Sequence, residues 1–352
     1  MVRRRRTSRR KSGLGCGGVF FGLVLLALLS AGAAAWFIFL PAGPAGETFV
    51  EIPIGSTSTQ IGAQLEKAGV VRSRYAFDLV RMYKRGVLKA GEYRFDHAVP
   101  VTEVYSRILR GDVFTLPVTI PEGATRFEIA ARVEQAGLAK REDFLTATVN
   151  ETALIADLDP NAKSLEGYLF PDTYRFPRKA TGAQIAAAMV RRFRAEATQA
   201  GLTGNGSTTH DVHSVVTLAS LVERETAVNA ERPLVASVLT NRLAKNMPLM
   251  TDPAVIYGLE VEGKWRGTIY QSDLAHDTPY NTYRHAGLPP GPIANPGLPS
   301  LRAALNPAAT TYLYFVAAGA DPQGKSRFAT TLDEHSKNVA SYRLAVKQAG
   351  GH

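Results

Sequence analysis

The stretch LASLVERETA, Leu218 to Ala227, is the most informative part of this chain, because it predicts a helix that ends in a glutamate on its apolar face. Apolar residues recur three and four positions apart from Val215 to Val222, and this spacing predicts a helix. At ~100° per residue, Glu225 lies about 20° from Leu218 around the helix axis. The helix therefore places this glutamate on its apolar face.

Two glutamates close the stretch, and the helix predicts different surroundings for them. Glu225 shares the dry face, whereas Glu223 points to the opposite side, beside Arg224, and is expected to be solvated. Burial penalises a charged carboxylate, so a carboxyl on a dry face keeps its proton to higher pH. That property suits a general acid working near neutral pH. The alternative is a glutamate near a helix C-terminus that simply reaches solvent.

The two glutamates cannot work as a pair. Positions i and i+2 do not face each other on a helix, so Glu223 and Glu225 diverge. Glycosidases that form a covalent intermediate usually need two carboxyls about 5–5.5 Å apart. A lone buried glutamate fits a reaction in which the substrate supplies its own nucleophile.

Most of the net positive charge of the chain lies at its N-terminus. The 352 residues, 45% of them hydrophobic, are enough for about two domains and carry a net charge of +10. Seven positive charges lie between Arg3 and Lys11, which leaves 34 basic residues against 31 acidic ones in the remainder. The folded part therefore has no basic stripe, and no nucleic-acid partner is expected.

An apolar segment follows this basic tail. Residues 19–40 contain no charge over 22 positions, enough to cross a bilayer of about 30 Å. The basic cluster favours a cytoplasmic N-terminus and an exported C-terminal part. A cleaved signal peptide is the alternative, with small residues at 30–35, but the apolar run continues through 36–40 and favours an uncleaved anchor. The single cysteine, Cys16, precedes the span, so the exported part has neither a disulfide nor a thiol nucleophile.

An internal repeat follows the short linker 41–46. The segments 52–55 (IPIG) and 66–69 (EKAG) recur 68 residues later as 120–123 (IPEG) and 134–137 (EQAG). Each copy predicts a strand, a Pro-x-Gly turn and a helix ended by glycine. Small repeated units of this kind serve as binding modules or form halves of one structural domain, and both interpretations stand for the second copy.

Periodicity and turn residues predict the remaining elements. Helices are expected over 185–200, 230–245 and 332–348, and short strands over 312–317 and 327–330. Loops are expected over 165–176, 201–209, 249–258, 280–283 and 287–297.

Two short motifs suggest other chemistry and are rejected. Residues 319–326 (GADPQGKS) match the phosphate-binding pattern G-x-x-x-x-G-K-S. However, Asp321 would repel phosphate, Pro322 lacks an N–H donor, and a strand rather than a helix is predicted next, so a hairpin turn is expected. His210 and His213 have a spacing seen at metal sites but no cysteine or acidic cluster to complete one. We expect no metal and no cofactor.

A series of longer motifs carries a family resemblance. They are LASLVERETA, ER at 231–232, VASV at 235–238, NRL at 241–243, TDP at 251–253, VIYG at 255–258, YNTY at 280–283, GLPPGPI at 287–293 and YLYFV at 312–316. From about Phe49 to the C-terminal helix, the chain resembles the endolytic murein transglycosylase family (MltG, also called YceG-like).

The resemblance implies an α+β architecture with a membrane anchor. The implied parts are a cytoplasmic basic tail (1–18), a transmembrane helix (19–40), a linker (41–47), a LysM-like small α/β subdomain (48–115) and a mixed α+β lytic transglycosylase catalytic domain (116–350). The last begins with a second LysM-like repeat at about 116–150. The implied location is the bacterial inner membrane, with the catalytic domain outside the cytoplasm.

The resemblance also implies a reaction and a site. Lytic transglycosylases of this family cut MurNAc–GlcNAc bonds within nascent peptidoglycan, leave 1,6-anhydroMurNAc ends and terminate glycan elongation. The matching catalytic residue is Glu225, acting as acid and then as base. Implied substrate-binding positions are Glu166, Tyr168, Thr251, Asp252, Tyr280, Asn281 and Tyr283. Implied partners are peptidoglycan strands, the membrane and synthases such as penicillin-binding proteins. The rival hypotheses are a non-catalytic, membrane-anchored peptidoglycan-binding scaffold and the rejected nucleotide enzyme.

Overall fold

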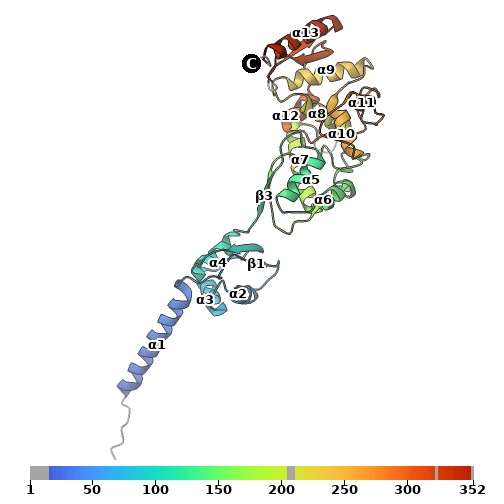
Figure 1. Ribbon diagram of the computed structural model, residues 1–352. Coiled ribbons are helices and arrows are strands. Elements are labelled where there is room, and N and C mark those ends of the chain that lie inside the picture. Colours follow the sequence, from blue (N-terminus) through green and yellow to red (C-terminus); the bar gives the residue numbers. More distant parts are fainter. Residues whose placement is uncertain (1–15, 204–210, 322–323, 350–352) are drawn as a thin grey trace, which may run out of the picture. The chain divides into compact units, whose positions relative to one another are not determined.

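The computed structural model describes residues 16–203, 211–321 and 324–349, and the chain divides into two units, Met1–Phe114 and Thr115–His352 (Figure 1). The secondary structure is mixed α and β, and the strands of the described residues form three two-stranded antiparallel sheets. The basic tail, most of the loop predicted over 201–209, and His210 lie outside the described residues.

The N-terminal unit opens with one long apolar helix, α1 (Cys16–Phe39). Its segment Val19–Phe39 has 21 residues, a mean hydropathy of 2.2 and no buried positions. By length and composition this helix could cross a bilayer, and either a membrane anchor or a signal sequence has these properties.

The first repeat copy forms a strand–helix–helix–strand unit. Its strands, the first and last elements, pair antiparallel, with Thr48 opposite Phe95. The elements are β1 (Thr48–Ile52), α2 (Ser58–Lys67), α3 (Arg74–Lys84) and β2 (Gly91–Phe95), and α4 (Val101–Arg110) follows them. Phe77, Tyr93 and Tyr105 are at most 1% exposed and form the centre of its core.

The second copy builds the same unit within the C-terminal unit. Its elements are β3 (Leu116–Thr119), α5 (Arg126–Gln135), α6 (Arg141–Asn150), the short 3₁₀ helix η1 (Thr152–Ile155) and β4 (Thr173–Phe176), and β3 pairs antiparallel with β4. The predicted strand, turn and helix of each copy are confirmed.

Matching local signals explain why both copies fold alike. The first helix of each copy begins with a capping box, in which a threonine cap and the third helical residue bond reciprocally: Thr57 with Gln60, and Thr125 with Glu128. The Pro-x-Gly turn of each copy ends in a glycine with positive φ, +83° and +75°, where a side chain would be strained. All these positions are 68 residues apart, as the repeat requires.

The rest of the C-terminal unit contains a buried helix, α8, against which three other helices pack. The elements are α7 (Gly182–Ala200), α8 (Val212–Glu225), α9 (Arg232–Ala244), α10 (Asp252–Val261), α11 (Gln271–Leu274), α12 (Leu298–Leu305), β5 (Tyr314–Ala317), β6 (Ser326–Ala329) and α13 (Leu332–Ala349). Helix α8 contacts α9, α10 and α12 (Figure 1), and its residues from Val216 to Val222 are all buried. This packing fixes the end of α8, where Glu225 lies.

The hairpin expected around the phosphate-binding pattern is confirmed, because β5 and β6 pair antiparallel on either side of it. Two loop predictions are wrong in part. The segment 249–258 contains most of α10. Thr251 occupies the N-cap position without a side-chain capping hydrogen bond, and Pro253 lies in the first turn of the helix, where proline is favourable. The last four residues of 165–176 form β4, because β3, more than 50 residues earlier, supplies the pairing partner.

Candidate active site

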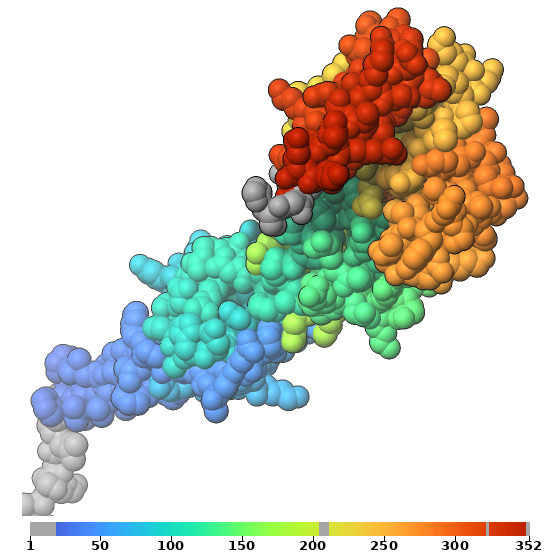
Figure 2. All heavy atoms as spheres, turned by 45° about the horizontal axis from the view of Figure 1, so that its top comes forward, coloured from blue at the N-terminus to red at the C-terminus, as the bar shows by residue number. Residues whose placement is uncertain are grey.

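Glu225 is the last residue of α8 and faces a pocket of about 440 Å³. The pocket walls come from five further segments of the C-terminal unit: α9, the loop entering α10 with the first turn of that helix, the turn that carries Tyr283, β5 and α13. Figure 2 shows the surface hollowed between the C-terminal residues, drawn in red, and the orange segment that carries α10 and α11. A glutamate in a concave site of this size is placed to contact a bound molecule.

The surroundings of Glu225 favour its protonated form. The residue is only partly exposed, and burial, followed by the charge of Asp252, raises its pKa to about 7. The positive charge of Arg242 acts in the opposite direction and is the weaker influence. Among the described residues, none forms a hydrogen bond with the Glu225 carboxyl. The proton is therefore held by desolvation and is not bonded within the protein.

Arg242 lines the pocket without forming an ion pair with Glu225. Its Nε donates to the carbonyl oxygen of Leu313 at 2.7 Å, and its Nη1 donates to that of Leu249 at 2.7 Å. The guanidinium carbon lies 5.4 Å from the centre of the Tyr314 ring. Burial lowers the pKa of Arg242. Arg242 therefore lowers the pKa of Glu225 through its positive charge and not through an ion pair.

Three of the predicted substrate-binding residues lie in this pocket. Tyr283 donates its hydroxyl to Asp252 Oδ1 at 2.6 Å, and Asp252 is exposed at the first position of α10. Thr251 is only 3% exposed, and its N–H donates to Thr282 Oγ1 at 2.9 Å. The structure therefore brings Thr251, Asp252 and Tyr283 together around Glu225.

Glu166 and Tyr168 do not line this pocket. Glu166 is 2% exposed and accepts hydrogen bonds from the Arg126 N–H, at 2.9 Å, and from Asn295 Nδ2, at 2.6 Å. Burial raises the pKa of Glu166 to about 7, and the hydrogen bond from Arg126 opposes that rise. Tyr168 is fully buried and donates to Asp159 Oδ2 at 2.8 Å. In this geometry both residues brace the loop that carries them.

Asn281 and Tyr280 also lie outside the lining of this pocket. Asn281 is fully buried and donates to the carbonyl oxygens of Leu274 and His276 at 2.9 and 2.7 Å. Tyr280 is partly buried and packs edge-on against Tyr257, with ring centres 5.0 Å apart. Asn281 holds the turn on which the pocket residue Tyr283 lies, since its Oδ1 accepts from the Tyr283 N–H at 3.0 Å.

The expectation that Glu223 is solvated is wrong. Its side chain is 4% exposed, lies 2.7 Å from Arg232 Nη2, and accepts from the Gly297 N–H at 2.9 Å. The helical face was assigned correctly, but the turn before α12 and the start of α9 cover it. The two glutamates differ because Glu223 is neutralised by a buried ion pair and Glu225 is not.

The C-terminal contribution to the pocket was missed at the sequence level. Tyr314 and Phe315 come from β5, and Leu332 and His335 come from α13. His335 stacks on Tyr314 with ring centres 5.1 Å apart, and its buried Nδ1 has no hydrogen-bond partner among the described residues. Burial, followed by the charge of Arg242, lowers the pKa of His335. A single histidine on a helix gives no pattern that could have identified it.

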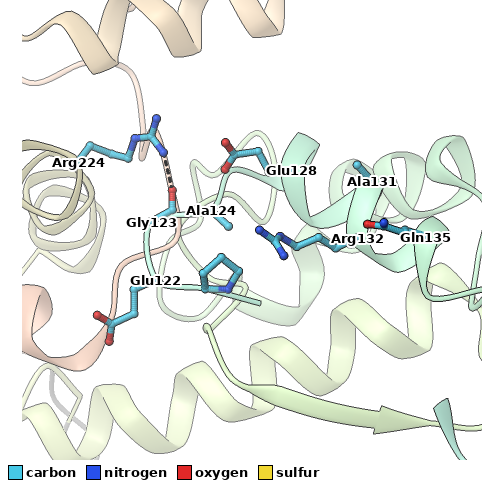
Figure 3. Close-up of a pocket in the computed structure, with 9 residues that line it drawn as sticks. Glu122, Gly123, Ala124, Glu128, Ala131, Arg132, Gln135 and Arg224 are labelled. Atoms are coloured by element: carbon cyan, nitrogen blue, oxygen red, sulfur yellow. Dashed lines mark hydrogen bonds between the residues drawn. The ribbon is translucent and has the colours of Figure 1, made fainter. Parts of the chain in front are cut away.

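A second pocket, of about 490 Å³, lies on the second repeat copy (Figure 3). It is lined by the Pro-x-Gly turn and by α5 side chains that include Glu128 and Arg132. Arg224 reaches it from α8 and donates to the Gly123 carbonyl oxygen at 3.1 Å. The Pro-x-Gly turn of the second copy is therefore packed against α8. In the turn of the first copy, the middle residue, Ile54, is 95% exposed.

No group of three or more His, Cys, Asp or Glu side chains within residues 16–203, 211–321 and 324–349 converges as metal ligands would. Fold and pocket together define an α+β protein whose site presents one desolvated, unpaired carboxyl at the end of a buried helix.

Comparison with known proteins identifies the family. The model of the YceG-like family matches residues 50–341, so the chain belongs to that family. It is 36% identical over 311 residues to a protein named endolytic murein transglycosylase from Bacillus subtilis (strain 168), covering 83% of this chain and 84% of that protein.

A second relative and a solved structure agree with this assignment. The chain is 33% identical over 362 residues to the endolytic murein transglycosylase of Streptococcus pneumoniae serotype 2 (strain D39 / NCTC 7466), covering 91% of this chain and 64% of that protein. The crystal structure of a yceG-like protein from Listeria monocytogenes matches with a TM-score of 0.53 and 34% identity, covering 83% of this chain and 98% of that one.

Proposed function

We propose that this protein is an endolytic murein transglycosylase that cuts MurNAc–GlcNAc bonds within nascent peptidoglycan strands and leaves 1,6-anhydroMurNAc ends. The names of its relatives support the reaction class. The observation that carries the proposal is the pocket glutamate itself: Glu225 is desolvated, has a pKa of about 7, and has no hydrogen-bond partner among the described residues.

In the proposed mechanism Glu225 acts twice. As a carboxylic acid it donates its proton to the glycosidic oxygen while the bond from that oxygen to C1 of MurNAc breaks. As a carboxylate it then accepts the proton of the MurNAc C6 hydroxyl while that oxygen bonds to C1. Glu225 ends protonated, and no water is consumed. A pKa near 7 lets one group fill both roles, because general acid–base catalysis is most efficient when the pKa lies near the working pH.

The proposed sugar contacts follow from the pocket walls. Tyr283, Tyr314 and Phe315 offer aromatic surface, while Thr251 and Asp252 offer hydrogen-bonding groups. Asn281 is proposed to act indirectly, by holding the turn that carries Tyr283. Glu166, Tyr168 and Tyr280 are proposed to support the fold around the site.

The proposed cellular setting combines the remaining features. Helix α1 anchors the protein in the bacterial inner membrane, with the tail 1–18 in the cytoplasm and the rest outside. Residues 48–115 form a LysM-like subdomain, and 116–350 form the catalytic domain, with a second LysM-like repeat at about 116–150. Close to the membrane, such an enzyme would terminate glycan elongation beside synthases such as penicillin-binding proteins.

Mass spectrometry of cleavage products tests the proposal. Full-length protein in detergent is incubated with uncrosslinked glycan strands, and the new ends are identified. We expect anhydro-ended internal fragments from the wild type and from Glu142→Gln, an exposed control on α6, and none from Glu225→Gln. Full activity of Glu225→Gln, or ordinary reducing ends, would overturn the mechanism. Glycan binding without fragment release by the wild type would indicate the scaffold instead.

A further inference from the structure

Helix α3 of the N-terminal unit exposes a continuous apolar stripe. Tyr75, Leu79, Met82 and Tyr83 recur four, three and one positions apart, and they are 63, 49, 74 and 90% exposed. The opposite face of the helix is fully used, since Ala76, Phe77 and Val80 are buried in the core. An apolar stripe of this size on the outer face of a helix marks an interaction surface.

The stripe begins where the apolar helix α1 ends. A groove of about 510 Å³ is lined from one side by Ile38 and Phe39 of α1 and from the other by Leu79 and Tyr83 of α3. The two helices contact each other, and Figure 1 shows α3 beside the C-terminal end of α1. The stripe and the apolar helix therefore form one continuous apolar surface.

A specific set of contacts holds α1 in this place. Arg72, in the turn before α3, donates from Nη1 to the Leu40 carbonyl oxygen at 3.0 Å and from Nη2 to that of Pro41 at 2.8 Å. The same guanidinium lies 5.6 Å from the centre of the Trp36 ring. These contacts bind Trp36 in α1 and the two residues that follow the helix, so the stripe keeps its place beside the helix end.

The residues flanking the stripe suit a phospholipid surface. Arg81, Lys84 and Arg85 are exposed at the C-terminal end of α3. Val87, in the loop that follows, is 82% exposed and extends the apolar surface. Tyrosines at a membrane surface sit at headgroup depth, and long basic side chains reach from an apolar face to the phosphates. Stripe and flanks together have the composition of an interfacial helix.

We propose that α3 lies in the outer interface of the bilayer that α1 crosses, with Leu79 and Met82 among the lipid chains and Tyr75 and Tyr83 at headgroup depth. This inference rests on the proposed membrane anchor, because that anchor places the end of α1 at the lipid–water boundary. The N-terminal unit is thus bound to the membrane by a span and by an adjoining surface helix, which fixes its orientation to the bilayer.

Spin labels on the full-length protein in phospholipid vesicles test the proposal. In a Cys16→Ser background, single cysteines replace Met82, Leu28 in the middle of α1, or Asp112 just beyond the far end of α4, and each carries a nitroxide. Collisions with oxygen, which concentrates in lipid, are compared with collisions with a water-soluble nickel complex. We expect the oxygen-to-nickel ratio at Met82 to exceed that at Asp112 several-fold and to stay below that at Leu28.

Each other result has a defined meaning. If the Leu28 label is in lipid but the Met82 label has the water-exposed ratio of Asp112, the surface helix is refuted and the anchor stands. If the Leu28 label is also exposed to nickel, the anchor fails, and the inference fails with it. Spin–spin broadening at Met82 in sparsely loaded vesicles would mean that two copies cover the stripe, which also overturns the proposal.

A charge variant gives a second readout. Replacing both Leu79 and Tyr83 by Glu places two carboxylates in the stripe, and the oxygen-to-nickel ratio of the Met82 label should fall to that of Asp112. The matched control Ile54→Glu alters an apolar residue that is 95% exposed and lies outside the stripe, and it should leave the Met82 ratio unchanged. Equal ratios in both variants would contradict the proposal.

Discussion

The pocket at Glu225 and the buried cluster around Glu166 each hold a glutamate whose pKa burial raises to about 7. Their difference lies in their bonding. Glu166 accepts hydrogen bonds from the Arg126 N–H and from Asn295, whereas Glu225 has none among the described residues. A raised pKa alone does not identify an acid catalyst, because the carboxyl must also face a cavity to come within hydrogen-bond reach of a ligand.

The charged neighbours sharpen the contrast. Arg242 stands near Glu225 but donates to two backbone carbonyl oxygens. Glu223, two residues earlier, is held in a buried ion pair with Arg232. Of these three glutamates, Glu225 is therefore the one that burial leaves without a compensating partner.

The largest expected effect is on turnover. Glu225→Gln should reduce the release of anhydro-ended fragments by roughly 10²–10⁴-fold, the usual contribution of a general acid–base group. Glu166→Gln should keep the wild-type rate per folded molecule, because Glu166 does not face the pocket. The rate of fragment release is measured after the folded fraction of each variant has been determined. A similar loss of rate in both variants would remove the distinction between the two sites.

The next largest expected effect is on stability, where Glu166→Gln should have the larger effect and Glu225→Gln the smaller one. The amide group of a glutamine at position 166 would oppose either the Arg126 N–H or Asn295 Nδ2, so Glu166→Gln should lose about 1–3 kcal/mol of unfolding free energy. Glu225→Gln breaks no hydrogen bond and should not be destabilised. Denaturant unfolding, followed by the fluorescence of Trp265 in a Trp36→Phe background, measures both. A stable Glu166→Gln protein would show that the bonded cluster does not support the fold.

What the sequence could predict follows from how local each signal is. The two repeat copies, their turns and the hairpin of β5 and β6 depend on caps, glycines and periodicity within a few residues, and these predictions are confirmed. The apolar face of α8 could also be predicted, because the spacing of apolar residues along the helix is a local signal.

The features that the sequence could not predict depend on distant contacts. Glu223 is buried by Gly297, 74 residues away, and Glu166 is held by Asn295, 129 residues away. His335 enters the pocket because α13 packs beside β5. No periodicity encodes such contacts, so the burial of Glu223 and the contribution of His335 were missed. The family resemblance identified loops near the site without distinguishing residues that line it from residues that brace it.

A smaller effect is the dependence of stability on pH. Both carboxyls have folded-state pKa values near 7, above the ordinary 4.5, so between these pH values the folded state binds more protons than the unfolded state. Stability should therefore fall as pH rises from about 4.5 to 7. Glu225→Gln should recover on the order of 1 kcal/mol at pH 8, a value reduced by solvent screening in the pocket. Unfolding midpoints at pH 5 and pH 8 measure this, and a variant whose pH dependence equals that of the wild type would refute the raised pKa of Glu225.

The smallest expected effect concerns Asp252, whose negative charge is the second cause of the raised pKa of Glu225. Asp252→Asn removes that charge, so the pKa of Glu225 should fall and the basic limb of the pH profile of kcat/KM should move to lower pH. This limb reports the free enzyme, in which Glu225 must carry its proton before substrate binds.

Tyr283→Phe is the matched control, because it removes the 2.6 Å hydrogen bond to Asp252 but keeps the charge. If Asp252 acts through its charge, only Asp252→Asn moves the limb; if it acts by holding Tyr283, both variants lower the rate and neither moves the limb. A limb that moves to higher pH in Asp252→Asn would contradict the assignment of Glu225 as the acid, since removing a nearby negative charge cannot make a carboxyl hold its proton more tightly.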